Sequence, residues 1–424
     1  MNKHVVFLEL TNNKAGLEFL RSTKSLGCDI TLVTFNVSYY EGLADGQTSA
    51  LSLVDHIVEY DVHDKPFEEI LTTFLDIDAN QPISQVIALM DLEIVTAALI
   101  NDALGLPGLA SRAAITCRNK YLARKASDAV GFTKPKYWLY NLESDRYPDN
   151  LEYPVVAKPI NCAGSNSVKL LQDAQELTDY IRQYQANSTY FRGVNKSQSI
   201  LLEQYITGDL YSIETFTQDG HHHVLGVSDR VMGELPNFPE ISACFPVDNA
   251  GTQKAVDKVK ELLSAIGFNI GFGHTEVIVN GEDVYLVEIN PRIAGSDISL
   301  IMNQCYDSKL YDNGVAAILG GRFQIPSLVG CGIWMNLVPS QSGIGTAIDY
   351  SGADVNVIKE SPRPFGRHLK TNPALMVETW GAITMFSSSA DALNHDLRVF
   401  YHHCDIEIDS VRVPLKDFHK DYVI

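Results

Sequence analysis

Short apolar runs alternate with amphipathic stretches along the first hundred positions. The apolar runs have the length of buried β-strands and lie at 5–10, 30–35, 56–60 and 86–90. The stretches between them have helical spacing and lie at 15–26, 66–75 and 92–104. Strands that alternate with helices are typical of a parallel α/β sheet. We therefore expect a Rossmann-like α/β domain at the N-terminus.

A second pattern, two apolar runs around an Asn-Gly turn signal at 280–281, predicts a β-hairpin. With a loop at 281–283, Glu276 lies directly opposite Glu288. Like charges in this arrangement destabilise a sheet. Both faces of the hairpin are otherwise apolar, so we also expect the pair to be poorly solvated. A divalent cation between the two carboxylates would resolve the conflict.

Two further residues extend this polar group beyond Glu288. Asn290 lies two positions on, on the same face of the strand, and adds a neutral oxygen ligand. Oxygen-only ligands of this kind suit Mg²⁺ that is completed by water and substrate phosphates. Arg292 follows on the same side, a planar cation suited to phosphoryl oxygens. The alternative is that Glu276 and Glu288 are surface residues of an ordinary hairpin.

A candidate phosphate site follows the strand that ends at Lys158 and Pro159. The small residues at 163–167, which include Gly164 and Ser165, let backbone N–H groups approach an anion closely. Lys158 would add a point charge for phosphate. The alternative is a plain hairpin loop with a surface lysine. Neither a P-loop motif nor a glycine fingerprint after the first strand is present.

A candidate base-binding edge lies at the end of another predicted strand, at 200–206. Its last residues would present backbone donors and acceptors to a purine edge. The alternative is an ordinary edge strand. The residues concerned are Glu203, Gln204, Tyr205 and Ile206.

The net charge, the cysteines and the apolar runs of the chain limit its expected partners and its cellular compartment. A net charge of −19 over 424 residues argues against nucleic acid and against an anionic membrane surface as partners. The seven dispersed cysteines contain no Cys-x-x-Cys, which is typical of a reducing compartment. No apolar run approaches the roughly 20 residues of a membrane span. The N-terminus does not have the pattern of a signal peptide. We therefore expect a cytoplasmic protein.

The order of these motifs resembles the ATP-grasp superfamily, from about residue 111 to about residue 302. The resemblance implies an α/β and α+β fold, with a two-subdomain unit after the N-terminal domain. The expected parts are an N-terminal α/β domain at 1–110, a small lid subdomain region at 111–200, a large subdomain with the metal site at 201–330, and a C-terminal part at 331–424 that packs on the large subdomain.

The resemblance also implies roles for single residues. Lys120 and Lys158 would contact the α- and β-phosphates of ATP. Glu203 and the backbone of 204–206 would take the adenine. Two Mg²⁺ ions, for which Mn²⁺ could substitute, would be bound by Glu276, Glu288 and Asn290, with Glu288 bridging. Arg292 would steady the transferring phosphoryl group. The usual acidic ribose contact is replaced here by Leu210, and the neighbouring Asp209 is the candidate substitute.

Within the superfamily, the segment 274–276 and the run 288–296 resemble L-amino-acid ligases and dipeptide-antibiotic synthetases. That resemblance implies an ATP-dependent carboxylate–amine ligase that works through an acyl phosphate and releases ADP and phosphate. Its partners would be a small carboxylate and an amine, and homodimers are common in the family. The substrate candidates are Asp91, as an ammonium site or a helix N-cap, His274, Gly295, Ser296 and a covering loop that carries Glu234 and Glu240.

Two other functions stay open at this point. One is an ATP-grasp carboxylase or formate-using transferase that acts on a nucleotide precursor. It would consume ATP with bicarbonate or formate instead of amino acids. The other is an ATP-binding module without turnover, which loss of the metal ligands would favour; here the candidate ligands are all present.

Overall fold

The computed structural model describes residues 2–143, 150–189, 191–233, 235–248, 250–338, 340–362, 368–369, 381–415 and 421–422. Its N-terminal domain is the predicted parallel sheet, with strand order β5-β2-β1-β6. Apolar side chains of β1 are fully buried between the flanking helices. The elements are β1 (His4–Leu8), α1 (Lys14–Ser25), β2 (Asp29–Thr34), β5 (His56–Glu59), α2 (Phe67–Asn80), β6 (Gln85–Ile87) and α3 (Ile94–Leu104).

The helical stretch predicted at 111–130 is two helices, α4 (Ser111–Arg118) and α5 (Lys120–Ala129). The break falls at Asn119, whose backbone is extended and whose side chain accepts hydrogen bonds from the N–H groups of 121 and 122. Asparagine is a preferred N-cap, and the sequence reading missed this signal. Lys120 therefore occupies the first turn of α5, and its backbone N–H reaches the carbonyl of Ile160.

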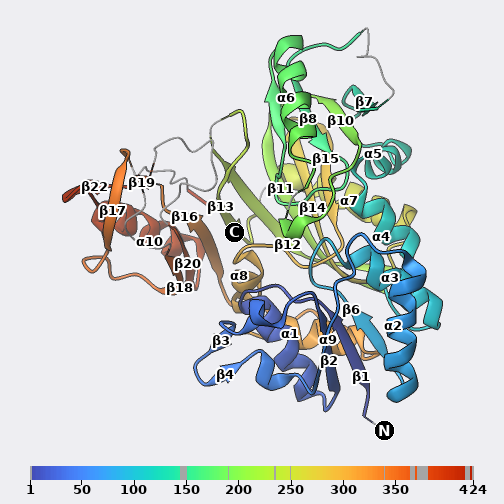
Figure 1. The fold of residues 1–424 in the computed structure, drawn as a ribbon. Helices are drawn as coiled ribbons and strands as arrows, with labels where there is room; N and C mark the ends of the chain where they lie inside the picture. The colour runs from blue at the N-terminus through green and yellow to red at the C-terminus, as the bar shows by residue number, and fades with distance from the viewer. Residues whose placement is uncertain are drawn as a thin grey trace.

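The small subdomain is an antiparallel sheet with order β7-β10-β8-β9, covered by one helix (Figure 1). This sheet stands above the N-terminal domain in the view of Figure 1. Its elements are β7 (Tyr137–Asn141), β8 (Val155–Pro159), β9 (Lys169–Leu171), α6 (Ala174–Ala186) and β10 (Ser199–Gln204).

The large sheet has the order β15-β14-β11-β12-β13-β16-β20-β18 among the described residues. It crosses the boundary expected at residue 330 without interruption, because β16 pairs with β13. Its elements and flanking helices are β11 (Asp209–Gln218), β12 (His221–Met232), β13 (Glu240–Phe245), α7 (Gln253–Ala265), β14 (Ile270–Asn280), β15 (Asp283–Asn290), α8 (Ile298–Cys305), α9 (Leu310–Ile318), β16 (Cys331–Asn336), β18 (Val357–Pro362), β20 (Gly381–Ser387) and α10 (Ala390–His403).

The remaining strands form two small sheets. One has the order β19-β17-β21-β22 and lies in the C-terminal part, on the left in Figure 1. The other is the pair β3-β4. Their bounds are β3 (Ala44–Asp45), β4 (Thr48–Ser49), β17 (Gly343–Asp349), β19 (His368–Leu369), β21 (Asp405–Ile408) and β22 (Val411–Pro414).

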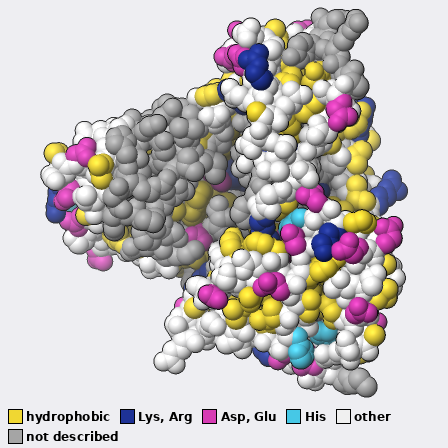
Figure 2. Space-filling model, in the orientation of Figure 1, with side chains coloured by type: hydrophobic (Ala, Val, Ile, Leu, Met, Phe, Trp, Pro, Cys, Tyr) yellow, Lys and Arg dark blue, Asp and Glu magenta, His cyan; other side chains and the backbone are white. Residues whose placement is uncertain are grey.

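Nucleic acid and membrane were not expected as partners, and the charge of the surface and the length of the helices bear on these two expectations. On the face drawn in Figure 2, Lys and Arg side chains are scattered and form no continuous basic patch. Within the described ranges, no helix is both long enough and apolar enough to cross a membrane. All seven cysteines are buried and unbonded to one another.

Candidate active site

A cavity of about 900 Å³ lies where the N-terminal domain, the small sheet and the large sheet meet. The carboxyl ends of β1 and β6 face it from below, which is where ligands bind in open parallel sheets. The phosphate-loop candidates of the small sheet and the predicted metal hairpin also line it. The site residues predicted from distant parts of the sequence therefore converge on one cavity, with the exception of Asp209. Asp209 is exposed, and it is Leu210 that lines the cavity.

The two carboxylates of the hairpin lie opposite each other, as predicted. Glu276 of β14 pairs with Glu288 of β15. The loop, however, is one residue shorter than expected, because Asn280 pairs with Asp283. A β-bulge at Val287 compensates for the difference, since Val277 pairs with Leu286 and leaves Val287 as the extra residue.

The bulge also decides which face Glu288 occupies. Strict alternation from Leu286 would turn Glu288 into the core beneath the sheet, where Leu286 is buried. With the extra residue, Glu288 shares the cavity face with Glu276. Their side chains are 20% and 15% exposed, which agrees with the expected poor solvation.

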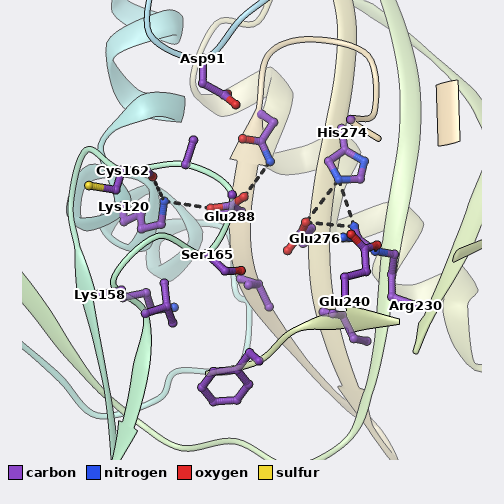
Figure 3. Close-up of a pocket in the computed structure, with 18 of the residues that line it drawn as sticks. Asp91, Lys120, Lys158, Cys162, Ser165, Arg230, Glu240, His274, Glu276 and Glu288 are labelled. Carbon is purple, nitrogen blue, oxygen red and sulfur yellow. Dashed lines mark hydrogen bonds and ion pairs between the residues drawn. The ribbon is translucent and has the colours of Figure 1, made fainter. Parts of the chain in front are cut away.

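Each carboxylate has its own cation (Figure 3). Lys120 Nζ lies 2.9 Å from Glu288 Oε2, and Arg230 Nη1 lies 3.0 Å from Glu276 Oε1. Asn290 donates from Nδ2 to Glu288 Oε1 at 2.9 Å. Burial alone would raise the pKa of Glu288, but the Lys120 ammonium and the Asn290 donor hold it well below its ordinary value. Both acids are therefore anionic near neutral pH.

This donor set fits Mg²⁺. In the part of the chain that the structure describes, no three His, Cys, Asp or Glu side chains gather as a metal-binding group. The candidate site instead consists of two carboxylates and the amide of Asn290, whose oxygen is its ligand atom. Mg²⁺ commonly takes one or two carboxylates and completes its shell with water and phosphate oxygens. In the structure, Lys120 and Arg230 balance the charges of the two carboxylates.

His274, Arg230 and Glu240 form the wall beside Glu276. His274 Nδ1 lies 2.9 Å from Glu214 Oε1, and its Nε2 lies 3.3 Å from Glu276 Oε1. Burial alone would lower the pKa of His274, but Glu214 raises it to about 9, which favours the protonated ring. Arg230 is bound between Glu276 and Glu240.

Sequence reasoning missed Arg230 and Glu214, and it assigned Glu240 to a covering loop. Glu240 is the first residue of β13 and pairs with Met232 across the sheet. Glu234, the other acid of that predicted loop, lies outside the described residues. Glu214, Arg230 and Glu276 lie on the three strands β11, β12 and β14. These side chains come together only because the strands pair, so no short sequence motif marks them.

The two lysines predicted to bind phosphate line the cavity on the small-sheet side. Lys120 Nζ donates to the carbonyl of Cys162 at 2.8 Å as well as to Glu288. Lys158 Nζ pairs with Glu203, which also accepts from Arg124 Nε at 2.7 Å. Burial alone would raise the pKa of Glu203, but these two cations lower it to about 2. The carboxylate of Glu203 is thus engaged by protein cations, while the residues that follow it, 204–208, line the cavity.

The small-residue loop between β8 and β9 is held in a left-handed conformation at three positions. Gly164, Ser165 and Ser167 have φ values of 61°, 54° and 61°. Asn166, which lies between the two serines, does not have a positive φ. Serine pays a steric cost in this region that glycine avoids. The turn therefore holds backbone strain at Ser165 and Ser167.

Asp91 joins the N-terminal domain to Arg292. Arg292 Nη2 lies 2.6 Å from Asp91 Oδ2, and Arg118 Nη1 lies 3.2 Å from Asp91 Oδ1. Asp91 does not cap α3, whose N-cap is Glu93. Burial alone would raise the pKa of Asp91, but the two arginines hold it below its ordinary value. Asp91 thus pairs with Arg292 and Arg118, the alternative of a helix N-cap is wrong, and the ammonium site stays a prediction. Gly295 and Ser296 line the cavity beside them.

Comparisons with known proteins agree with this geometry. Residues 151–299 match the ATP-grasp domain family. Dapdiamide A synthase of Enterobacter agglomerans is 24% identical over 62% of this chain and 61% of its own length. Alanine–anticapsin ligase of Bacillus subtilis is 24% identical over 55% of this chain and 53% of its own length. The chain thus matches less than two thirds of either relative.

Among solved structures, an L-amino acid ligase from Bacillus licheniformis superposes with a TM-score of 0.75 and 21% identity, over 96% of this chain and 98% of that one. The two chains share a fold. The fold class and the ATP-grasp resemblance predicted from sequence are confirmed by these matches.

Proposed function

We propose that this chain is an ATP-dependent carboxylate–amine ligase, because residues 151–299 match the ATP-grasp domain family. The observation that carries the proposal is the buried Glu276–Glu288 pair, which shares one cavity with Lys120, Lys158 and Arg292. Two anionic acids opposite two lysines form a site for a metal–triphosphate complex. By their names, one of the two relatives given above is a synthase and the other a ligase, which favours a ligase over other ATP-grasp reactions.

ATP would lie between the small and large sheets. Lys120 and Lys158 would bind its phosphates, and the backbone of 204–206 would take the adenine. Glu276, Glu288 and Asn290 would hold Mg²⁺, with two ions as the proposed number. Bound Mg²⁺ would neutralise charge on the phosphoryl oxygens. Lys120 and Arg230 would then exchange their carboxylate partners for phosphate and substrate groups.

The proposed reaction has two steps. In the first, a carboxylate oxygen of the substrate attacks the γ-phosphorus, the bond to the bridging oxygen breaks, and ADP leaves. In the second, the amine nitrogen attacks the acyl carbon, inorganic phosphate leaves, and the amine loses a proton. Charge spreads over the phosphoryl oxygens in the first step, so positioned cations can supply the catalysis without a protein nucleophile.

Arg292 is the proposed cation for the transferring phosphoryl group. Its pairing with Asp91 holds the guanidinium at the cavity wall, where it is only 16% exposed. A preoriented cation in a poorly hydrated site stabilises charge more than it would in water. Apolar walls at Leu89 and Ile293 limit water near the acyl phosphate.

We propose amino acids as both substrates, which would make the product a dipeptide or a related amide. The name of the alanine–anticapsin ligase includes an amino acid, which supports an amino-acid substrate. On the acceptor side, the His274 imidazolium and Arg230 would face a substrate carboxylate, and Glu240 would face an ammonium group. Gly295 and Ser296 would contribute backbone N–H groups.

The test is a matrix of amino acids and small acids with Mg²⁺ and ATP, assayed for phosphate release, with mass spectrometry of the products. We expect one phosphate per amide bond, with at least one amino-acid pair. Label transfer adds a check of the mechanism, since a carboxylate labelled with ¹⁸O should pass one labelled oxygen to the released phosphate. Phosphate release with bicarbonate or formate alone would instead support a carboxylase or transferase.

A further inference from the structure

The arginine at position 192 of the small subdomain is buried against the N-terminal domain. Arg192 lies in a short 3₁₀ turn between α6 and β10, and its side chain is 3% exposed. Its Nη1 lies 3.1 Å from Glu93 Oε1 and 3.5 Å from Glu9 Oε2. Its guanidinium carbon lies 4.3 Å from the ring centre of Phe35. A cation from one subdomain is thus enclosed by acids and an aromatic ring of another.

The acceptor side of this contact is preformed. Glu9 accepts from the Tyr40 hydroxyl at 2.6 Å and from the backbone N–H of Phe35 at 2.6 Å. Glu93 lies 3.0 Å from His63 Nε2. These partners fix both carboxylates at the carboxyl ends of β1 and β6, so the arginine enters a pocket whose geometry the N-terminal domain itself holds.

Backbone strain marks both sides of the contact. Arg192 has φ 59° and Glu9 has φ 61°, and neither is glycine. Such residues persist in the left-handed region only where the surrounding structure fixes them, and they cluster at functional positions. A surface ion pair whose only role is solubility would not need strained backbone in both partners.

Arg192 is connected to the proposed phosphoryl site through its contacts with two residues, Met90 and Glu93. Arg192 Nη2 lies 3.3 Å from Met90 Sδ, and Arg192 Nη1 contacts Glu93. Met90 and Glu93 flank Asp91, whose carboxylate orients Arg292. Arg192 therefore contacts the segment 90–93 on both sides of the residue that orients the proposed catalytic arginine.

The segment 195–197, which follows the turn that carries Arg192, is bonded to the phosphate-loop side. Asn161 donates from Nδ2 to the carbonyl of Asn195 at 3.2 Å, and its Oδ1 accepts from the N–H of Ser197 at 3.0 Å. Asn161 begins the loop in which Lys120 binds the carbonyl of Cys162. Movement of the small sheet would therefore be transmitted to Arg192 through the segment 195–197.

From these contacts we propose that Arg192 is a positioning residue for phosphoryl transfer. It locks the segment 90–93 when the small subdomain lies against the N-terminal domain, and so holds Asp91 against Arg292. Transfer would then proceed only with the small subdomain in place over the nucleotide. The proposal rests on the ligase function given above.

Steady-state kinetics test the coupling, with Arg192→Ala, Arg192→Lys and the control Arg182→Ala. Arg182 belongs to the same subdomain but is 72% exposed and pairs only with Asp179 within α6. In Arg192→Ala we expect kcat to fall at least about tenfold while the KM for ATP changes less than about threefold, because the nucleotide contacts lie elsewhere. Arg192→Lys should recover part of kcat, since it keeps the charge but loses the planar fork.

A value of kcat for Arg192→Ala within about twofold of Arg182→Ala would overturn the proposal. So would a rise in the KM for ATP with unchanged kcat, which would make Arg192 a nucleotide-binding residue. If Arg192→Ala does not fold, Arg192→Lys is compared with Arg182→Ala in its place. We then expect an intermediate loss of kcat.

Hydrogen exchange separates this proposal from the proposed function, because it needs no turnover. With Mg²⁺ and a non-hydrolysable ATP analogue, the amides of residues 90–93 should exchange faster in Arg192→Ala than in the parent chain or in Arg182→Ala. Equal exchange in all three would overturn the coupling. Faster exchange in a chain that shows no ligase turnover would leave the coupling standing and remove only the proposed reaction.

Discussion

Glu276 and Glu288 are register partners on neighbouring antiparallel strands, and each is neutralised by a cation from a different element. Arg230 comes from β12 and Lys120 from the start of α5. Two anionic side chains at this spacing would repel each other in a bare hairpin. The surrounding cations make the pair stable without metal and place positive groups where phosphate oxygens would enter.

Removal of the Arg292 guanidinium should slow turnover far more than it weakens ATP binding. A preorganised cation that acts on developing charge contributes mainly in the transition state, so we expect Arg292→Ala to lower kcat about 100-fold. The dissociation constant of ATP, measured by calorimetry, should change much less. Arg322→Ala, an exposed arginine, is the control. Weakened ATP binding with intact kcat would remove the transition-state role.

Asp91→Asn distinguishes an orienting role from an ammonium site. Partners that orient a functional group typically contribute 10- to 100-fold, so we expect kcat to fall by about tenfold or more. The KM of the amine substrate should stay near that of the parent chain. A large rise in that KM with little loss of kcat would instead support the ammonium site predicted for Asp91.

The buried Glu203 should make stability sensitive to acid. Its pKa of about 2 lies below the ordinary value of 4.5, so its contribution is fully present above pH 4.5 and is lost as the pH falls towards 2. The shift corresponds to stability on the order of 3 kcal/mol. In urea unfolding at pH 5 and pH 3, Glu203→Gln should lose less stability between the two pH values than the parent chain. Equal losses would show that Glu203 is not held by Lys158 and Arg124 as described.

Ser167→Gly should relieve strain in the phosphate loop. Ser167 has φ 61°, and a non-glycine residue in this region costs roughly 1 kcal/mol. The backbone carbonyl of Ser167, which accepts from the Tyr180 hydroxyl at 2.6 Å, is kept. We expect the KM for ATP to fall by about two- to fivefold. A higher KM would mean that the serine hydroxyl itself contributes to binding.

Local patterns predicted much of this fold. The N-terminal sheet follows from apolar runs long enough for buried strands, and the hairpin follows from its turn signal. The helix break at Asn119 was missed, although an asparagine N-cap can be read from sequence. The facing pair at 276 and 288 was predicted with a loop one residue too long, and the bulge at Val287 made up the difference.

The partners of the predicted site residues could not be found in this way. Asp91 and Arg292 are 201 positions apart and meet only because two domains pack together. Arg230 of β12 pairs with Glu276 of β14 across β11, which lies between these two strands in the sheet. β12 and β14 are not consecutive in sequence. Charge pairing inside a cavity depends on this tertiary arrangement, so sequence spacing carries no signal for it.

Binding of Mn²⁺ in place of Mg²⁺ tests the central claim most directly, because it needs no knowledge of the substrates. Free Mn²⁺ is followed by electron paramagnetic resonance with a non-hydrolysable ATP analogue present. The parent chain and the control Glu282→Ala, whose side chain is 95% exposed at the hairpin tip, should bind two ions tightly. Glu288→Ala should lose tight metal binding and at least about 100-fold in turnover, while nucleotide binding partly survives. Unchanged Mn²⁺ binding or normal turnover in Glu288→Ala would contradict the account.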